Sequence, residues 1–175
     1  MYSFYEYVEK HPQFNRATFD NDFALLKLEQ RLTFSDKIKK VELANHDDKI
    51  NPGDLCWLVG WGALYGDSRQ VKTIHYGNIA QTDLLHKLLV QIYDNSFCNK
   101  IYKDQWTENM ICAGHDNQSK GQCNGDAGGP LICHNKLFGI LSFGKENKEC
   151  GRHPDVYGRV KKVRKWIKEK TGINS

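Results

Sequence analysis

The sequence predicts an all-β fold that ends in a single C-terminal α-helix. Short runs of β-branched, aromatic and aliphatic residues recur along the 175 residues, separated by Gly, Pro, Asn and Asp, which is typical of strands joined by tight turns. Six cysteines, none of them in a Cys-x-x-Cys pair, indicate a disulfide framework rather than a zinc site. A basic amphipathic stretch at the C-terminus predicts the helix.

The composition indicates a globular protein from an oxidising compartment. Hydrophobic residues make up 39% of the chain and aromatic residues 11%, which is enough for one sizeable core. A net charge of +4 is too small to imply a nucleic-acid partner. No apolar run is long enough to span a membrane. We therefore expect a secreted protein, and the lack of a signal peptide suggests a truncated product or an incomplete gene model.

Two strands are expected in the N-terminal part. Residues 2–8 are aromatic and β-branched, and His11-Pro12 should end this strand because proline cannot donate to a ladder. The apolar run 23–28 follows Asp22 and predicts a buried strand. By propensity alone, Asp22 caps or turns the chain into that strand.

The middle of the chain predicts further strands around one short helix. Residues 55–62 form an apolar run whose Trp57 and Trp61 are expected to pack in the core. Strands are also predicted at residues 84–94, 110–114, 131–133 and 136–143. Residues 95–102 predict a helix capped by Asp94 or Asn95. Asn117 begins an N-glycosylation sequon.

The C-terminal stretch from Arg159 to Lys170 carries seven basic residues against one acid. Its apolar positions share one helical face, and they are Val160, Val163, Trp166 and Ile167. A helix docked by Trp166, with its charges in solvent, is one interpretation. The alternative is a glycosaminoglycan or other polyanion site formed by Lys161, Lys162, Arg164 and Lys165.

The segment 121–131 is a glycine-rich loop whose backbone can approach a ligand closely. Its sequence, Cys-Asn-Gly-Asp-Ala-Gly-Gly-Pro-Leu from Cys123, resembles the nucleophile loop of the trypsin/chymotrypsin family of serine endopeptidases. The attacking serine of that family is replaced by Ala127. A methyl group has neither a lone pair to attack a carbonyl nor a proton to transfer, so acyl transfer cannot begin there.

The resemblance implies a chymotrypsin-like double antiparallel Greek-key β-barrel in a single domain, residues 1–175. Residues 1–51 would be a remnant of the first barrel and a connector, 52–160 the second barrel, and 161–175 the C-terminal helix. The incomplete first barrel should leave strand edges that aggregate or pair with another chain. The family pattern also implies three disulfides, Cys56–Cys133, Cys98–Cys112 and Cys123–Cys150.

The resemblance also assigns catalytic positions. The segment Asp-Phe-Ala-Leu-Leu-Lys-Leu puts Asp22 at the triad aspartate, but nothing in the 21 preceding residues matches the family's histidine segment. The backbone N–H groups of Gly125 and residue 127 would form the oxyanion hole. Asp126 matches the acid that binds the new amino terminus after activation. Without that partner, we expect the loop to relax into a zymogen-like arrangement.

Substrate-binding positions follow from the same resemblance. Ser142, Phe143 and Gly144 match the strand that pairs with an extended peptide, although an ordinary edge strand is the alternative. Gly121 falls at the floor of the specificity pocket, where trypsin has an aspartate. Asp155 stands on the pocket wall, where it either holds a basic side chain or fills the pocket, and filling is the preferred interpretation.

These features predict a serine-endopeptidase homologue that does not cleave peptides. It would bind a protein or peptide ligand, as a decoy for protease substrates or for a protease inhibitor, and would need no cofactor or metal. One alternative is a truncated or mutated form of an active secreted enzyme. Another is a polyanion-binding protein that acts through the C-terminal helix.

Overall fold

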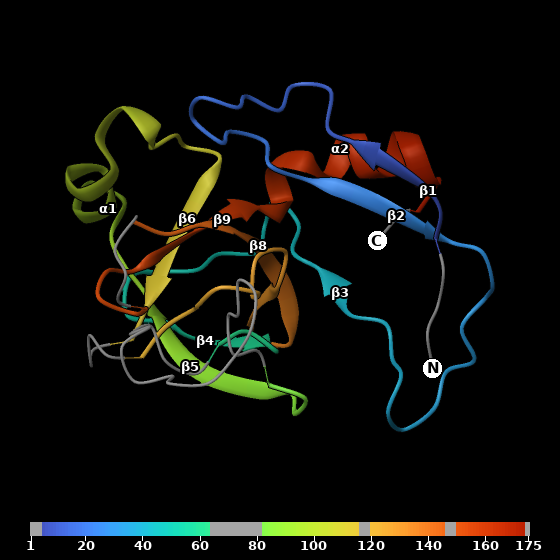
Figure 1. The fold of residues 1–175 in the computed structure, drawn as a ribbon. Coiled ribbons are helices and arrows are strands. Elements are labelled where there is room, and N and C mark those ends of the chain that lie inside the picture. The colour runs from blue at the N-terminus through green and yellow to red at the C-terminus, as the bar shows by residue number, and fades with distance from the viewer. Residues whose placement is uncertain (1–4, 64–81, 116–119, 146–149, 174–175) are drawn as a thin grey trace, which may run out of the picture.

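The computed structural model describes residues 5–63, 82–115, 120–145 and 150–173. A closed antiparallel barrel of six strands dominates it (Figure 1). Around the barrel the strands follow the order β4, β5, β6, β9, β8 and β7, and the pairing of β8 with β9 closes it. Their bounds are β4 Leu55–Gly60, β5 His86–Ile92, β6 Met110–Gly114, β7 Pro130–Cys133, β8 Lys136–Phe143 and β9 Asp155–Arg159.

Alternation along the strands creates the barrel interior. In β4, Cys56 and Leu58 are almost fully buried, whereas Trp57 between them is 40% exposed, because successive side chains of a strand point to opposite faces. Trp61 follows the strand and is 54% exposed. The expectation that Trp57 and Trp61 pack in the core is therefore wrong. The Trp57 ring instead lies on the surface under the ammonium group of Lys87, 4.5 Å from the ring centroid.

A second, smaller sheet lies beside the barrel (Figure 1). It consists of β1, Tyr5–Lys10, and β2, Ala24–Leu28, in antiparallel register. As expected, β1 ends immediately before His11-Pro12. The connector that follows contributes β3, Glu42–Leu43, which pairs in parallel with β8.

A groove of about 680 Å³ separates the small sheet from the barrel and the C-terminal helix. Its walls are mainly aliphatic and aromatic, and its floor includes Leu137 and Ile140 of β8 together with Trp166. The small sheet thus covers the barrel incompletely.

Side-chain hydrogen bonds join the N-terminal segment to the barrel. The Asp20 carboxylate accepts a bond from Thr107 Oγ1 at 2.7 Å and two from Asn109 Nδ2 at 3.1 and 3.2 Å. Lys136 of β8 donates to both carboxylate oxygens of Asp48 in the connector, at 2.9 and 3.0 Å. Because each bond spans more than 80 residues of sequence, these contacts fix the connector against the barrel.

Two α-helices form where the sequence predicts them. Helix α1, Asn95–Tyr102, is capped by Asp94, whose Oδ1 accepts from Ser96 N at 2.7 Å; a one-turn 3₁₀ helix, η1, Lys103–Gln105, continues it. Helix α2, Val160–Thr171, ends at Gly172 in the left-handed conformation. Val160, Val163 and Trp166 are buried, as the apolar stripe predicts.

Three disulfides connect the barrel strands and their loops. They are Cys56–Cys133, Cys98–Cys112 and Cys123–Cys150, the pairs that the family resemblance implies. The first joins two neighbouring barrel strands, the second ties α1 to β6, and the third anchors the glycine-rich loop to the segment before β9. Each closed loop restricts the unfolded chain and stabilises the fold by about 3–4 kcal/mol in the chain-entropy model.

Candidate functional site

The glycine-rich loop lies between the third disulfide and β7. Gly125 and Gly128 have φ angles of +100° and +84°, a conformation that residues with side chains rarely adopt. The Gly128 N–H donates to Leu141 O of β8, and Leu141 N donates to Gly129 O, both at 2.8 Å. Strand β8 therefore holds the loop in place, with Ala127 between the two positive-φ glycines.

The Asp126 carboxylate points back toward the chain that leaves β4. Its Oδ1 accepts from Gly62 N at 2.8 Å, and its Oδ2 accepts from Cys123 N at 3.0 Å. A side chain at Gly60 or Gly62 would collide with this carboxylate. Two backbone N–H groups thus bind Asp126, at the position where the family resemblance implies an amino terminus. The expectation of a relaxed loop assumed a carboxylate without partners, and these two donors weaken that assumption.

Asp22 and Ser142 meet across 120 residues of sequence. The Ser142 hydroxyl donates to Asp22 Oδ2 at 2.6 Å, a short distance typical of a hydrogen bond to an ionised acceptor. Ser142 lies between Leu141 and Phe143, where the pairing of β8 with β9 shifts by one residue. This β-bulge turns the Ser142 side chain toward the loop that carries Asp22.

No described histidine is bonded to Asp22, whose recorded hydrogen-bond partner is Ser142. His11 is buried elsewhere, with its ring 4.7 Å from that of Trp166 in an edge-to-face arrangement. Burial lowers the pKa of His11 below its ordinary value. The imidazole therefore packs as a neutral ring under the C-terminal helix, far in sequence from the glycine-rich loop.

Asp155 is a buried acid at the start of β9, with 4% of its surface exposed. Its carboxylate accepts from Gln122 N at 3.3 Å and from the Gln122 side chain. Burial raises the pKa of Asp155 to about 7; the Gln122 bonds oppose this shift, and the nearby charge of Asp126 adds to it.

Two glycines make room for the Asp155 carboxylate. A Cβ at Gly144 would lie 2.7 Å from Asp155 Oδ1, and one at Gly121 would lie 3.4 Å from Oδ2 and collide with the Gly151 backbone. The Asp155 side chain therefore occupies the space between Gly121 and Gly144, which the family resemblance assigns to the specificity pocket.

The strand end at Phe143 is flanked by aromatic rings that the sequence did not single out. The Phe143 ring lies 5.3 Å from that of Phe19 and 5.5 Å from that of Tyr102, centroid to centroid. Phe19 keeps 38% of its surface exposed, so the pair presents an apolar edge beside Ser142 and Gly144. The aromatic character of Phe19 was a usable signal, but its partner could not be read from the sequence.

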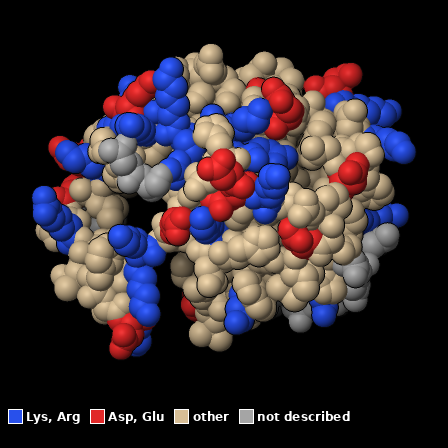
Figure 2. All heavy atoms as spheres, turned by 180° about the vertical axis from the view of Figure 1, so that it is seen from behind, with Lys and Arg blue, Asp and Glu red and all other residues tan. Residues whose placement is uncertain are grey.

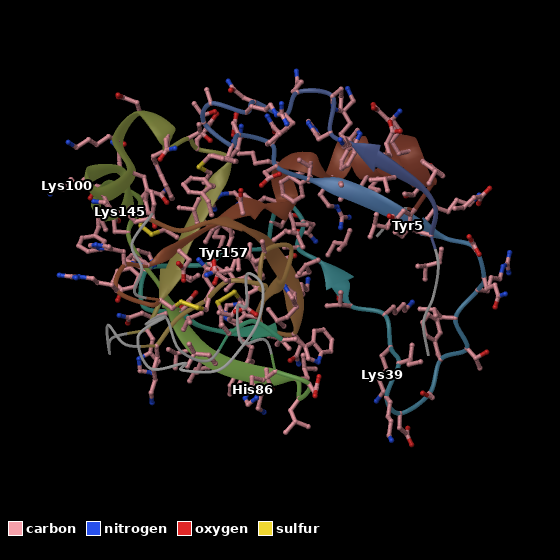
Figure 3. All side chains as sticks on the ribbon, viewed as in Figure 1. Tyr5, Lys39, His86, Lys100, Lys145 and Tyr157 are labelled. Carbon is pink, nitrogen blue, oxygen red and sulfur yellow. A yellow bond between two sulfur atoms is a disulfide. The ribbon has the colours of Figure 1, made fainter. Side chains whose placement is uncertain are left out.

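Tyr157 lies inside the barrel (Figure 3). Its hydroxyl has no hydrogen-bond partner among the described residues. Burial raises its pKa far above the ordinary value, and Asp155 and Asp126 add to the effect. A neutral phenol is therefore retained beneath the two acids.

The basic residues of α2 are partly engaged within the chain. Lys162 pairs with Glu108 at 3.1 Å, the Lys170 ammonium lies 2.5 Å from Glu9, and Arg164 donates to Leu43 O. Figure 2 shows Lys and Arg side chains interspersed with Asp and Glu over the back of the molecule. These contacts reduce the positive charge that the helix can offer a polyanion.

Comparison with known proteins places these features in one family. The trypsin family model matches residues 3–167. The chain belongs to the trypsin family. It is 36% identical over 168 residues to trypsin 5G1 of Aedes aegypti, covering 95% of this chain and 59% of that protein. It is 35% identical over 164 residues to human kallikrein-4, covering 93% and 58%. The chain thus spans less than two thirds of each trypsin-family relative.

The structure of neuropsin, a serine protease expressed in the limbic system of mouse brain, matches with a TM-score of 0.78 and 30% sequence identity. The match covers 95% of this chain and 70% of neuropsin. With the closed barrel and the C-terminal helix, it confirms the predicted chymotrypsin-like fold. The roles of Asp22, Gly125 and Ala127 and of the substrate-binding positions remain predictions.

Other sites predicted from the sequence are less fully described. Asn117 lies outside the described residues, so the sequon has no structural account. Among the described residues, no helix is long and apolar enough to cross a membrane. No group of three or more His, Cys, Asp or Glu side chains in the described ranges could hold a metal ion.

Proposed function

We propose that this trypsin-family chain binds protein or peptide ligands without cleaving them. The observation that carries the proposal is Ala127, which occupies the nucleophile position of the family's loop. No other described side chain at this loop offers a nucleophile with an adjacent base. Loss of a triad nucleophile lowers turnover about a millionfold in subtilisin, where the oxyanion hole supplies what remains.

The retained parts of the site support binding. Asp22 and Ser142 are hydrogen-bonded, so the strand end at Ser142 is fixed against the N-terminal segment. Gly144 follows this strand, where an extended peptide could pair with the backbone by β-addition. The apolar edge formed by Phe19 and Phe143 would contact a side chain of the same peptide.

We further propose that the specificity pocket is filled by Asp155. Its carboxylate is buried and bonded to Gln122, so a bound peptide would be held by its backbone rather than by a large side chain in the pocket. A peptide with a small residue at this position fits this arrangement.

The first test is catalytic. The purified chain should hydrolyse neither peptide nor ester substrates, and a fluorophosphonate probe should not label it. Ala127→Ser should also resist labelling, because no described histidine is placed to activate the new hydroxyl. Ester turnover by the original chain that a serine-directed reagent blocks would refute the proposal.

The second test is binding. Protein inhibitors of trypsin-like enzymes should bind the immobilised chain, and Phe19→Asn should weaken binding because it removes the exposed ring while tolerating the positive φ at that position. Phe34→Asn is the matched control, since it removes an aromatic ring that is 63% exposed in the connector. Equal binding by both variants, or none by the original chain, would count against this site.

A truncated or mutated form of an active secreted enzyme is the second candidate. It is favoured by the limited span of 59% and 58% of the relatives' lengths, and the three disulfides fit a secreted protein. Sequencing the transcript across codon 127 and upstream of Met1 distinguishes the candidates. A serine codon together with an upstream histidine segment would support this one.

The polyanion hypothesis is tested separately on heparin. Salt-sensitive retention that is lost when Lys161, Lys162, Arg164 and Lys165 are neutralised would support it. Because Lys162 and Arg164 have partners within the chain, we expect weak retention.

A further inference from the structure

The outer edge of β1 is open. Among the described strands, β1 pairs with β2 alone, in a sheet of two strands. A two-stranded ribbon is marginally stable in water, and an unpaired edge presents N–H and C=O groups to another chain. This edge is therefore a surface that a further strand could extend.

The backbone of β1 shows which groups face outward. The His11 N–H donates to Phe23 O at 2.9 Å, and Lys10 lies opposite Ala24 in the register. In an antiparallel pair, alternate residues direct both their N–H and C=O groups to the same side. Since His11 faces β2, the backbone groups of Lys10 and Val8 face the open edge.

The same edge carries apolar side chains in solvent. Tyr5 is 56% exposed, Tyr7 44% and Val8 40%, and Leu26, which pairs with Val8, is 58% exposed. Tyr5 lies at the far side of the molecule from α1 (Figure 3). Adjacent exposed apolar residues beside an unpaired edge are typical of an interaction site rather than of a protected edge.

We propose that β1 pairs with β1 of a second copy of this chain. In the antiparallel register that places Val8 opposite Val8 of the second copy, the outward N–H and C=O groups of the two valines bond each other. The result is a four-stranded sheet with strand order β2, β1, β1 and β2. Val8 and Leu26 of both copies then form one continuous apolar strip on it. The contact is isologous and closes as a dimer.

Charge favours this register and this partner. It brings Glu6 of each copy opposite Lys10 of the other, so two opposite-charge pairs form around the twofold axis. Glu6 lies at the irregularity between Tyr5 and Tyr7, and its side chain is 56% exposed. A shift of the register by one residue places Glu6 opposite Glu9, which is repulsive. A peptide of another sequence lacks this self-complementarity.

The test is the solution mass of the full chain, measured by light scattering and sedimentation. The original chain should form a dimer that dissociates on dilution. Val8→Pro should be monomeric, because it removes the central N–H of the contact. The strand β1 should survive this change, since proline is tolerated where the N–H faces away from the sheet; an unaltered circular dichroism spectrum checks this.

Charge reversal tests the register itself. Glu6→Lys or Lys10→Glu alone should weaken dimerisation by roughly tenfold, because each change creates two like-charge pairs. The double reversal should restore the dimer. Lys27→Gln is the matched control: it breaks the 2.7 Å ion pair of Lys27 with Glu6 within one chain but leaves the β1 edge unchanged, so its dimer should persist.

Two results would overturn the proposal. One is a monomer at every concentration that the chain tolerates. The other is an association, dimeric or larger, that Val8→Pro and both single charge reversals leave unaltered.

Discussion

Burial of the Asp155 carboxyl should make the protein less stable as the pH rises from about 4 to about 7. Its pKa is about 7 in the folded chain, against 3.8 for a solvated aspartate. A difference of about 3 pKa units corresponds to about 4 kcal/mol. This is the free energy by which the fold favours the protonated over the ionised acid.

The sign follows from proton binding. Below pH 3.8 the acid is protonated in both the folded and the unfolded chain, and above pH 7 it is ionised in both. Between these values the folded chain holds more protons, so the free energy of unfolding falls by about 1.4 kcal/mol per pH unit as the pH rises. Asp155 therefore favours the fold most in acid and least above pH 7.

The assay compares the original chain with Asp155→Asn by urea denaturation at pH 4 to 8, with tryptophan fluorescence as the readout and the disulfides intact. The difference in unfolding free energy should rise from its value at pH 4 by about 4 kcal/mol at pH 8, in favour of the asparagine. Burial lowers the pKa of His11 and of His153, so these residues lose stability as the pH falls. Their contribution cancels in the difference.

A matched control removes an exposed acid. Asp47→Asn, in the connector, should give a difference that varies little with pH, because that residue is exposed. A pH-independent difference between Asp155→Asn and the original chain would show that Asp155 titrates normally, and would refute the reasoning.

Three further predictions concern hydrogen-bonded carboxylates and use the same denaturation assay. A double-mutant cycle of Asp22→Ala and Ser142→Ala should give a coupling of about 1–3 kcal/mol; additive effects would contradict the hydrogen bond. Asp20→Ala should cost about 2–3 kcal/mol, since it leaves the barrel donors unpaired, and an unaltered denaturation midpoint would contradict this. Asp126→Asn should destabilise by about 1–3 kcal/mol, because one N–H would meet an amide donor; stabilisation would instead identify an acid that lacks partners.

Periodicity was sufficient to predict most strands and both α-helices. The residues 110–114 and 95–102 coincide with β6 and α1, because a continuous apolar run and an N-cap are local signals. Strand β9, Asp155–Arg159, was not predicted. It begins with an acid, contains a glycine and is buried on both faces between β6 and β8, so it shows no alternation. Its strand character comes from its two neighbours.

The tryptophans of β4 show a second limit of local reasoning. Trp57 has the composition of a core residue, but it falls between two cysteine- and leucine-bearing inward positions and is turned outward by the strand period. Residue type alone therefore gave the wrong face, whereas the alternation of Cys56 and Leu58 could have indicated the correct one.

The candidate site could be predicted residue by residue but not as an arrangement. The family resemblance supplied Asp22 and Ser142 separately, and their 2.6 Å contact depends on a β-bulge and on the packing of the N-terminal segment. The surroundings of Asp155 come from Gln122 and from the lack of side chains at Gly121 and Gly144. None of these positions is close to Asp155 in sequence, so only the fold could decide between a filled and an open pocket.

The two interpretations of Asp155 differ in what they require of its charge. A pocket that holds a basic side chain needs the carboxylate ionised and accessible, whereas a filled pocket needs it buried, as its 4% exposure indicates. A cationic ligand that enters the pocket could recover at most the roughly 4 kcal/mol by which burial disfavours the ionised acid. Benzamidine affinity that rises steeply up to pH 7 would therefore favour a holding role. Affinity that is absent at every pH supports filling, because the ligand must first displace the Gln122 bonds.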